Sequence, residues 1–387
     1  MKNICFITGS RAEYGLLKRL MFLTKKEKNL KMQLIVSCMH LSSKFGNTFR
    51  EIKNDGFKIN YKADLRIKTS KVDDICKYVG RGVQQLSNAY KKLNPDYIVL
   101  LGDRFETFSA ATAALIHNIP IIHIHGGELT ESLIDDAFRH SITKMSSYHF
   151  VANKIYKKRV IQLGEDPKKV FNVGGLGVDN IKNTSLLSKK EIEKKLKIKF
   201  MKKNLIVTFH PETLTVKKTQ KDIKIILKEL SKLKDTCIIF TSSNADTNGD
   251  YINFQIKKFV KSKSNSYFFY SLGSKNYYSC LKYVDAVIGN SSSGLAEVPS
   301  FNKYTLNLGN RQDGRLKAES VIDSEIDGKK IKKNINIIYK KNLKTKLKKV
   351  INPYGNGDAS KKIFKIMNKL NSKKDTNKKS FFDIKFK

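Results

Sequence analysis

The stretch DYIVLLGDRFETFSAATAALIHNIPIIHIHGG, residues 96–127, decides the fold class. It contains two continuous apolar runs, each ending in small or polar residues, and an amphipathic segment at 106–118 lies between them. Continuous apolar runs separated by helices are typical of parallel strands in a sheet that is covered on both faces. The stretch therefore predicts a strand, a helix and a second strand parallel to the first.

The same alternation recurs along the chain in two sets, and a lysine-rich break near residues 180–203 separates them. The first set also contains NICFITGS (3–10), MQLIVSC (32–38) and YHFVAN (148–153), and the second contains NLIVTFH (204–210), CIIFTSS (237–243), SYFFY (266–270), AVIGNSS (286–292) and YTLNLGN (304–310). We therefore predict an α/β protein with two doubly wound, Rossmann-like domains that face a central cleft. The expected bounds are residues 1–185 and 200–350. Residues 351–387 are expected to form a C-terminal helix and a lysine-rich, frayed or loosely docked tail that packs back on the first domain.

Composition narrows the class of protein. With 387 residues, of which 40% are hydrophobic, the chain can fill two cores, and no apolar run is long enough to span a membrane. The N-terminus enters a strand-like run directly, without a signal-peptide layout. The five scattered cysteines favour reduced thiols in the cytoplasm over disulfides or a zinc site.

The formal net charge of +40 raises the question of nucleic-acid binding. Only ten of the 75 basic residues are arginine, the lysines are spread along the chain, and we find no known nucleic-acid-binding motif. We therefore interpret the charge as a solvated lysine surface and expect no nucleic-acid partner.

Two turns in the first half carry candidate site residues. TGSRAEYG (8–15) lacks dinucleotide-binding and Walker spacing, but its strand-to-helix turn suits an anion that Arg11 could bind. Equally, Arg11 could be a surface charge and Glu13 a first-turn helix acid. In LGDRFE (101–106), Asp103 follows a buried strand and could be a catalytic base, a helix cap or an orienting group.

The segment IPIIHIHGGELTESLIDDAFRH (119–140) holds the densest group of ionisable residues. On a strand, His123 and His125 would point to one face, either as metal ligands or as a hydrogen-bonded pair under a loop. Gly126 and Gly127 indicate a close approach of the backbone. On a following helix, Asp135 would pair with Arg139, and Asp136 with His140, at a spacing of four residues. These pairs are either surface salt bridges, or Asp135 and Arg139 point into the cleft beside His125 and Glu128.

In the second half, His210 ends a strand, and GNSSSGLAEVPS (289–300) follows another. Its candidates for binding a nucleotide diphosphate are Ser292, Ser293, Gly294 and Glu297. Backbone N–H groups and hydroxyls at a helix start would hold the pyrophosphate, and Glu297 would bind the ribose hydroxyls. The alternative is a serine-rich helix cap with a first-turn acid.

Taken together and in order, eight strings resemble one family, the hydrolysing UDP-N-acetylglucosamine 2-epimerases of bacterial sialic-acid biosynthesis. They are TGSRAEYG, LGDRFE, HIHGGE, RHSITKMS, KKRVIQLGE, FHPETL, SSNADT and GNSSSGLAEVPS, and the resemblance covers roughly residues 1–330. It implies a GT-B fold, a homo-oligomer (dimer or tetramer), and conversion of UDP-GlcNAc and water to UDP and N-acetylmannosamine. It implies no redox cofactor and no obligatory metal.

The resemblance also implies roles for the candidate residues. Arg11 and His210 would attend the diphosphate, Ser292, Ser293 and Glu297 would hold UDP, and Asp103, Asp135 and Arg139 would belong to the acid/base site. Two positions depart from relatives, because Leu16 stands where non-hydrolysing relatives have Lys, and His125 stands where many have a carboxylate. Asp103 or Glu128 is therefore the expected base, with neutral His125 assisting the second proton transfer.

Two enzymatic alternatives remain open from the sequence. The same chemistry could act on UDP-2,4-diacetamido-2,4,6-trideoxyglucose, on the way to legionaminic acid. A glycosyltransferase of the same fold would instead pass the sugar to an acceptor.

Overall fold

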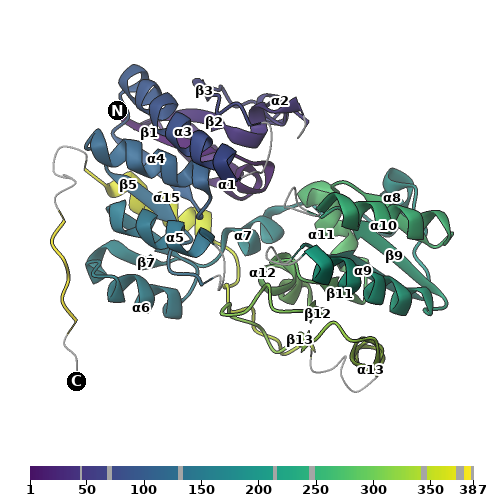
Figure 1. Ribbon diagram of the computed structural model, residues 1–387. Helices are drawn as coiled ribbons and strands as arrows, with labels where there is room; N and C mark the ends of the chain where they lie inside the picture. The colour runs from purple at the N-terminus through teal and green to yellow at the C-terminus, as the bar shows by residue number, and fades with distance from the viewer. Residues whose placement is uncertain are drawn as a thin grey trace. The chain divides into compact units, whose positions relative to one another are not determined.

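A computed structural model describes residues 1–43, 46–67, 72–129, 134–211, 216–243, 249–340, 347–371 and 379–384. Parts of the strings FHPETL and SSNADT, and much of the expected tail, therefore lie outside the described residues. The chain divides into two compact units: unit 1 is Met1–Asn180 with Gly357–Lys387, and unit 2 is Ile181–Asn356. Each unit is described by itself (Figure 1).

Unit 1 is built on a parallel sheet with the strand order β3-β2-β1-β4-β5-β6-β7 among its described residues. The strands are β1 (Lys2–Thr8), β2 (Leu30–Ser37), β3 (Tyr61–Ala63), β4 (Tyr97–Leu101), β5 (Ile121–Ile124), β6 (Tyr148–Val151) and β7 (Val170–Asn172). The helices are α1 (Arg11–Lys26), α2 (Phe49–Asn54), α3 (Val72–Leu93), α4 (Phe105–Ile116), α5 (Ile134–Met145), α6 (Lys154–Gln162), α7 (Leu176–Asn183) and α15 (Ala359–Lys369).

The central strands of unit 1 are mainly apolar because helices cover both faces of the sheet. Along β1, Ile4 and Phe6 pack with side chains of α1 and α15, whereas Cys5 and Ile7 pack with those of α3 and α4. This alternation is the period of two that a strand imposes. Figure 1 shows α3, α4 and α5 along one side of the sheet.

Unit 2 repeats the plan with the strand order β10-β9-β8-β11-β12-β13, again parallel. Its strands are β8 (Lys203–Thr208), β9 (Thr236–Thr241), β10 (Ser266–Phe269), β11 (Ala286–Gly289), β12 (Tyr304–Leu308) and β13 (Val321–Ser324). Its helices are α8 (Lys189–Leu196), α9 (Val216–Ser231), α10 (Gly249–Lys261), α11 (Gly273–Tyr283), the short α12 (Ser293–Ala296) and α13 (Gly328–Ile338). Helices α9, α10 and α13 cover one face, and α8 and α11 cover the other.

Every strand that the apolar runs predicted is present, but three further strands escaped the sequence analysis. They are β3, β7 and β13, which lie at sheet edges and have only three or four residues each. Strands this short give no continuous apolar run of the length that predicted the others, whereas β10, which also lies at an edge, has such a run in SYFFY. Helix α8 also differs from expectation, because it lies inside the supposed lysine-rich break and yet contributes buried Ile192 to a core of unit 2.

Helix α15 returns to unit 1 and packs against α1 with Ile363 and Met367 in the shared core. The Lys2 ammonium fixes the end of this helix, since it donates to the carbonyls of Asn368 at 2.7 Å and Leu370 at 2.6 Å. Within the described ranges, no helix has the length and apolarity needed to cross a membrane.

Candidate functional site

Four of the sequence-predicted residues follow the strands at which the strand order of each sheet reverses. In unit 1 the reversal is between β1 and β4, and in unit 2 it is between β8 and β11. Loops leaving the carboxyl ends of such neighbouring strands form the ligand-binding crevice of open α/β sheets. Arg11 and Asp103 follow the first pair of strands, and His210 and Ser292 follow the second.

Arg139 on α5 is the centre of the cluster in unit 1. Its side chain is only 2% exposed, and its guanidinium forms an ion pair with Asp103, the residue that follows Gly102 at the end of β4. It also donates to Asp136 Oδ1 at 3.1 Å and to the carbonyl oxygen of Glu128 at 2.9 Å. A buried arginine needs such partners to offset its lost hydration. Arg139 thereby ties together the loops after β4 and β5 and the first turns of α5.

His125 does not lie on a strand, so the expectation that it shares a face with His123 is wrong. Strand β5 ends at Ile124, and His125 adopts a left-handed conformation with φ of 66°. Its backbone N–H donates to the Phe150 carbonyl at 2.9 Å. A left-handed conformation at a non-glycine residue costs about 1–3 kcal/mol, which the surrounding structure must offset. The backbone at His125 is therefore strained, at the carboxyl end of β5.

One hydrogen bond of the His125 ring indicates the tautomer of its neutral form. The Leu176 backbone N–H donates to Nε2 at 3.3 Å, so Nε2 is the acceptor and the neutral ring carries its proton on Nδ1. Nδ1 lies 3.8 Å from the Glu128 carboxylate. His125 and Glu128 thus form a neighbouring proton donor and acceptor beside the Asp103–Arg139 pair.

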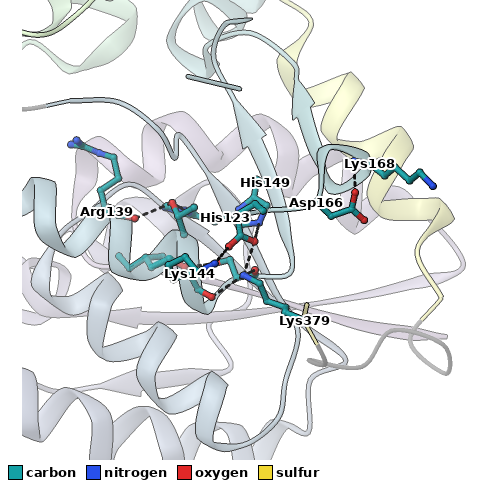
Figure 2. Close-up of polar contacts among 11 residues, drawn as sticks. His123, Arg139, Lys144, His149, Asp166, Lys168 and Lys379 are labelled. Carbon is teal, nitrogen blue, oxygen red and sulfur yellow. Dashed lines mark hydrogen bonds and ion pairs between the residues drawn. The ribbon is translucent and has the colours of Figure 1, made fainter. Parts of the chain in front are cut away.

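His123 points into the protein interior and has a structural role. Its Nε2 lies 2.8 Å from the Gly102 carbonyl, and its Nδ1 lies 3.3 Å from Thr143 Oγ1 on α5 (Figure 2). Burial lowers its pKa to about 3, so the ring is neutral at physiological pH. The interpretation of a histidine hydrogen-bonded under a loop is confirmed for His123.

The two glycines after His125 allow close packing, as the sequence predicted. A Cβ on Gly126 would lie 3.1 Å from both His123 Nδ1 and Thr143 Oγ1. A Cβ on Gly127 would lie 2.5 Å from the Tyr156 carbonyl, and φ at Gly127 is +77°. The loop therefore packs directly on α5 and on the backbone of α6.

The side-chain pairs predicted along α5 are found only in part. Asp136 and His140 lie 3.4 Å apart, as their spacing predicted, while Asp136 also pairs with Arg139. Asp135 is half-buried in the first turn of α5, directly after residues 130–133, which lie outside the described residues. Because Arg139 is buried, its ion pairs are not the surface salt bridges that the sequence also allowed.

The turn after β1 is occupied by the protein's own carboxylate. Glu13 Oε2 accepts the backbone N–H groups of Gly9 at 2.7 Å and Ser10 at 3.1 Å, and Ser10 caps α1 in return. Arg11, the first residue of α1, is exposed. The interpretation of Glu13 as a first-turn acid is confirmed, and two N–H groups expected to suit an anion already have an acceptor.

A second buried carboxylate near this turn was missed from the sequence. Glu106 on α4 is 2% exposed, pairs with Arg104 at 2.7 Å, and lies so close to Gly9 that a Cβ there would be 2.6 Å from its side chain. Burial and the nearby Glu106 carboxylate raise the pKa of Glu13 to about 7. Glu13 and Glu106 come close because β1 and β4 are neighbouring strands. The two residues are 93 positions apart in the sequence, so no local pattern predicts their contact.

In unit 2, an asparagine joins the loops after β8 and β11. Asn290 Oδ1 accepts the His210 backbone N–H at 2.7 Å, and Asn290 Nδ2 donates to the His210 carbonyl at 2.9 Å. The Asn290 carbonyl in turn accepts from Arg311 at 3.2 Å and Gln312 at 2.8 Å. Burial, with a smaller effect of the Arg311 charge, lowers the pKa of His210 to about 3. The sequence analysis missed Asn290, Arg311 and Gln312. Their side chains bond to main-chain atoms of His210 and Asn290, and a sequence pattern does not show such contacts.

The candidate residues in the serine-rich loop of unit 2 differ in their exposure to solvent. Ser292 is exposed, while Gly294 lies against β12, where a Cβ would be 2.6 Å from Thr305 Cγ2. Ser293 Oγ lies 2.5 Å from Glu297 Oε2 and 2.7 Å from the Tyr277 hydroxyl.

Glu297 faces the tyrosines of α11. The Tyr278 hydroxyl donates to Glu297 Oε1 at 2.8 Å, and burial raises the pKa of Glu297. Ser293 and Glu297 are therefore fixed by α11, and the two tyrosines were not among the predicted site residues.

Comparison with known proteins agrees with this geometry. The two parallel sheets and their helices form an α/β fold of GT-B type. The model of the UDP-N-acetylglucosamine 2-epimerase family matches residues 23–368, and the chain belongs to this family.

The chain is similar to two curated relatives in sequence and to a solved structure in fold. The chain is 44% identical over 327 residues to the GDP/UDP-N,N'-diacetylbacillosamine 2-epimerase (hydrolyzing) of Campylobacter jejuni, covering 84% of this chain and 85% of the relative. It is 40% identical over 385 residues to polysialic acid biosynthesis protein P7 of Escherichia coli, covering 99% and 98%. The S. aureus MnaA–UDP co-structure matches with a TM-score of 0.76 and 19% identity, covering 95% of this chain and 96% of that one.

Proposed function

We propose that the protein is a hydrolysing 2-epimerase that converts UDP-GlcNAc and water to UDP and N-acetylmannosamine. The observation that carries this proposal is the cluster of Asp103, Arg139, Glu128 and His125 at the carboxyl edge of a sheet in a chain of this family. The product would feed sialic-acid synthesis for a surface polysaccharide, in keeping with the name of the 40% identical relative. The five cysteines are all free, as is usual in a cytoplasmic enzyme. By resemblance to the family, we propose a homo-oligomer, a dimer or tetramer.

The reaction has two halves that both need proton transfer at C2. In the first, a base takes the proton from C2 as the C1–O bond to UDP breaks, which leaves 2-acetamidoglucal. In the second, the hydroxide of water adds at C1, and a proton returns to C2 from the opposite face. The balance is one water consumed and one UDP released, and general acid and base groups must flank C2.

The unit 1 cluster supplies groups of the required kinds. Asp103 is a carboxylate held in one orientation by Arg139, so it can accept the C2 proton. Glu128 is the second candidate base, and the Nδ1 proton of His125 lies on the side facing it. We propose that Asp103 or Glu128 takes the proton and that neutral His125 assists its return. Asp135 would complete the site from the first turn of α5.

Unit 2 would hold the nucleotide. Ser292, Ser293, Gly294 and Glu297 would bind UDP, with His210 and, from unit 1, Arg11 at the diphosphate. Support comes from the loop geometry, because the Asn290–His210 hydrogen bonds bring the two loops of unit 2 together at its strand reversal. Glu297, which Tyr278 and Ser293 hold in place, has the chemistry to accept ribose hydroxyls.

A second substrate is favoured by one comparison. The 44% identical relative is named for N,N'-diacetylbacillosamine, the 2,4-diacetamido-2,4,6-trideoxy sugar, carried on GDP or UDP. The same elimination and hydration would act on this sugar, since its C1 and C2 are substituted as in UDP-GlcNAc.

Proton NMR in deuterated water tests both substrates in one experiment. Incubation with UDP-GlcNAc should give UDP and N-acetylmannosamine with deuterium at C2. If UDP-GlcNAc stays unchanged and the UDP- or GDP-linked diacetamido sugar turns over with deuterium at C2, the diacetamido sugar replaces UDP-GlcNAc as substrate. Release of nucleotide without deuterium at C2 would contradict the elimination mechanism.

A further inference from the structure

The C-terminal segment, residues 379–384, lies against a buried charge cluster of unit 1 that the proposed chemistry does not use. Its first residue, Lys379, places its ammonium 2.6 Å from Glu165 Oε2, 2.7 Å from the Ser146 carbonyl and 2.8 Å from the Lys144 carbonyl. An ammonium has three donors, and here each meets an oxygen. The two carbonyls are at the end of α5, where a helix leaves its last carbonyls without intrahelical partners.

Glu165, which follows α6, is the anion at the centre of this cluster. It is 2% exposed and accepts from His149 Nε2 at 2.8 Å and Lys144 Nζ at 2.8 Å, besides Lys379 (Figure 2). Burial by itself would raise the pKa of Glu165, but the hydrogen bonds from His149, Lys144 and Lys379 outweigh it and lower the pKa to about 2. A buried carboxylate is costly unless cations pair with it, and the C-terminal segment supplies one of those cations.

The residues after Lys379 make contacts of other kinds at the same place. The Phe382 backbone N–H donates to the Gly164 carbonyl at 3.0 Å. The Phe381 ring covers Gly164, where a Cβ would be 2.3 Å from the ring. The Lys144 ammonium lies 4.9 Å from the centre of the same ring. Charge, backbone and aromatic contacts thus converge, which is how proteins recognise an extended peptide.

The cluster is adjacent to the acid/base site through β5 and β6. His149 on β6 is the register partner of His123 on β5. His123 in turn contacts the Gly102 carbonyl, next to Asp103, and Thr143 of α5. Helix α5 therefore carries both Lys144, in the cluster, and Arg139, which pairs with Asp103.

We propose that the end of α5 and the turn after α6 form a peptide-binding site whose resident ligand is the chain's own segment Lys379–Ile384, and that its occupancy holds α5 in the position where Arg139 pairs with Asp103. The ligand class is a basic–aromatic peptide, Lys-x-Phe-Phe. Tethering to α15 of the same unit raises the effective concentration of the segment to about the millimolar range, so modest intrinsic affinity suffices for occupancy.

Amide hydrogen exchange of the full-length protein tests the binding site directly. Lys379→Met should speed exchange at the Phe382 amide at least about tenfold, because the ion pair that seats the segment is lost. The matched control is Lys168→Met, since Lys168 is an exposed lysine of the same unit whose side chain points away from the cluster in Figure 2. Equal exchange in wild type and Lys379→Met, or equal acceleration in both variants, would overturn the proposal.

A peptide supplied in trans provides a second readout. A fluorescent Lys-Ser-Phe-Phe-Asp-Ile peptide should bind saturably to the Lys379→Met/Phe381→Ala protein, whose own segment is weakened. A version with Met in place of Lys should bind at least about tenfold more weakly, because it lacks the ammonium that meets Glu165. Equal binding of the two peptides would contradict the assigned site whatever reaction the enzyme catalyses.

Kinetics test the link to α5, and this step rests on the proposed function. Lys379→Met should lower kcat several-fold with KM unchanged, and saturating peptide should restore kcat. If the segment is released in exchange experiments and kcat stays at the wild-type value, the effect on Arg139 is refuted. Absence of epimerase activity in the wild type would refute the proposed function and leave the exchange result to decide on the site.

Discussion

Arg139 binds three loop and helix oxygens at once, so its neighbours depend on it for both charge and position. The carboxylate of Asp103 lies in the ion pair, and its side chain is about one-fifth exposed. It is therefore shielded by protein on most sides but remains reachable from solvent, as the proposed exchange of a proton with a sugar requires.

We predict that Asp103→Asn lowers kcat by about 10²- to 10⁴-fold, the usual contribution of a general base. The amide keeps the size of the carboxylate but cannot accept the C2 proton. UDP affinity, measured by calorimetry, should stay unchanged, because the residues assigned to UDP are mostly in unit 2. Near-normal turnover of the variant would assign the base to Glu128 instead.

The buried pair of Glu13 and Glu106 predicts a pH dependence of stability. The pKa of Glu13 is raised from 4.5 to about 7, so the stabilisation due to its bound proton is complete below pH 4.5 and is lost as the pH rises through 7. The free energy of unfolding should fall over that window by up to about 3 kcal/mol.

Glu13→Gln should remove this part of the slope, because the amide accepts the Gly9 and Ser10 N–H groups without titrating. Urea unfolding at pH 5 and pH 8 measures the difference, and Glu319→Gln, at an exposed position of unit 2, is the control. An unchanged slope in Glu13→Gln would show that the proton resides elsewhere.

At the scale of elements, the parallel pairing of β8 and β11 in unit 2 requires a glycine at the end of β11. Gly289 ends β11 with φ of +134°, and a Cβ there would lie 1.8 Å from the Thr208 carbonyl. The adjacent residue is Asn290, which ties the two loops together. No side chain fits without separating the two strands.

We predict that Gly289→Ala destabilises unit 2 by more than about 3 kcal/mol and abolishes UDP binding. Gly273→Ala is the matched control, since Gly273 also has a positive φ, +68°, but has nothing within 4 Å of its Cβ position. The control should lose only about 1–2 kcal/mol, the cost of the left-handed backbone. Thermal unfolding and UDP calorimetry of both variants make the comparison, and equal losses would contradict it.

Elements with long apolar runs could be predicted because burial on both faces leaves a continuous pattern, as in β1 and β4. The position of His125 could not, because the strand ends one residue earlier and the backbone turns left-handed before Gly126. The partners of Glu165 and the closeness of Glu13 to Glu106 could not be predicted either. They depend on which strands and termini become neighbours, and sequence separation does not encode that.

At the scale of the whole molecule, the two units have separate hydrophobic cores and separate candidate chemistry. We predict that UDP, added at about 100 times its Kd, slows amide exchange in the loops after β8 and β11. The free energy of opening of these loops should rise by up to about 2.7 kcal/mol. The loops after β4 and β5 should change less, because they are assigned to the sugar. Stronger protection there than in unit 2 would move the nucleotide site to unit 1.

The distribution of thiols has a practical consequence. Cys76 on α3 is exposed, whereas Cys5, Cys38, Cys237 and Cys280 are buried. A maleimide dye should therefore label the native enzyme at one place, on a helix of unit 1 remote in sequence from every candidate site residue. One engineered surface cysteine in unit 2 would then complete a donor–acceptor pair for single-molecule fluorescence, which would measure the distance between the two labelled sites with and without UDP.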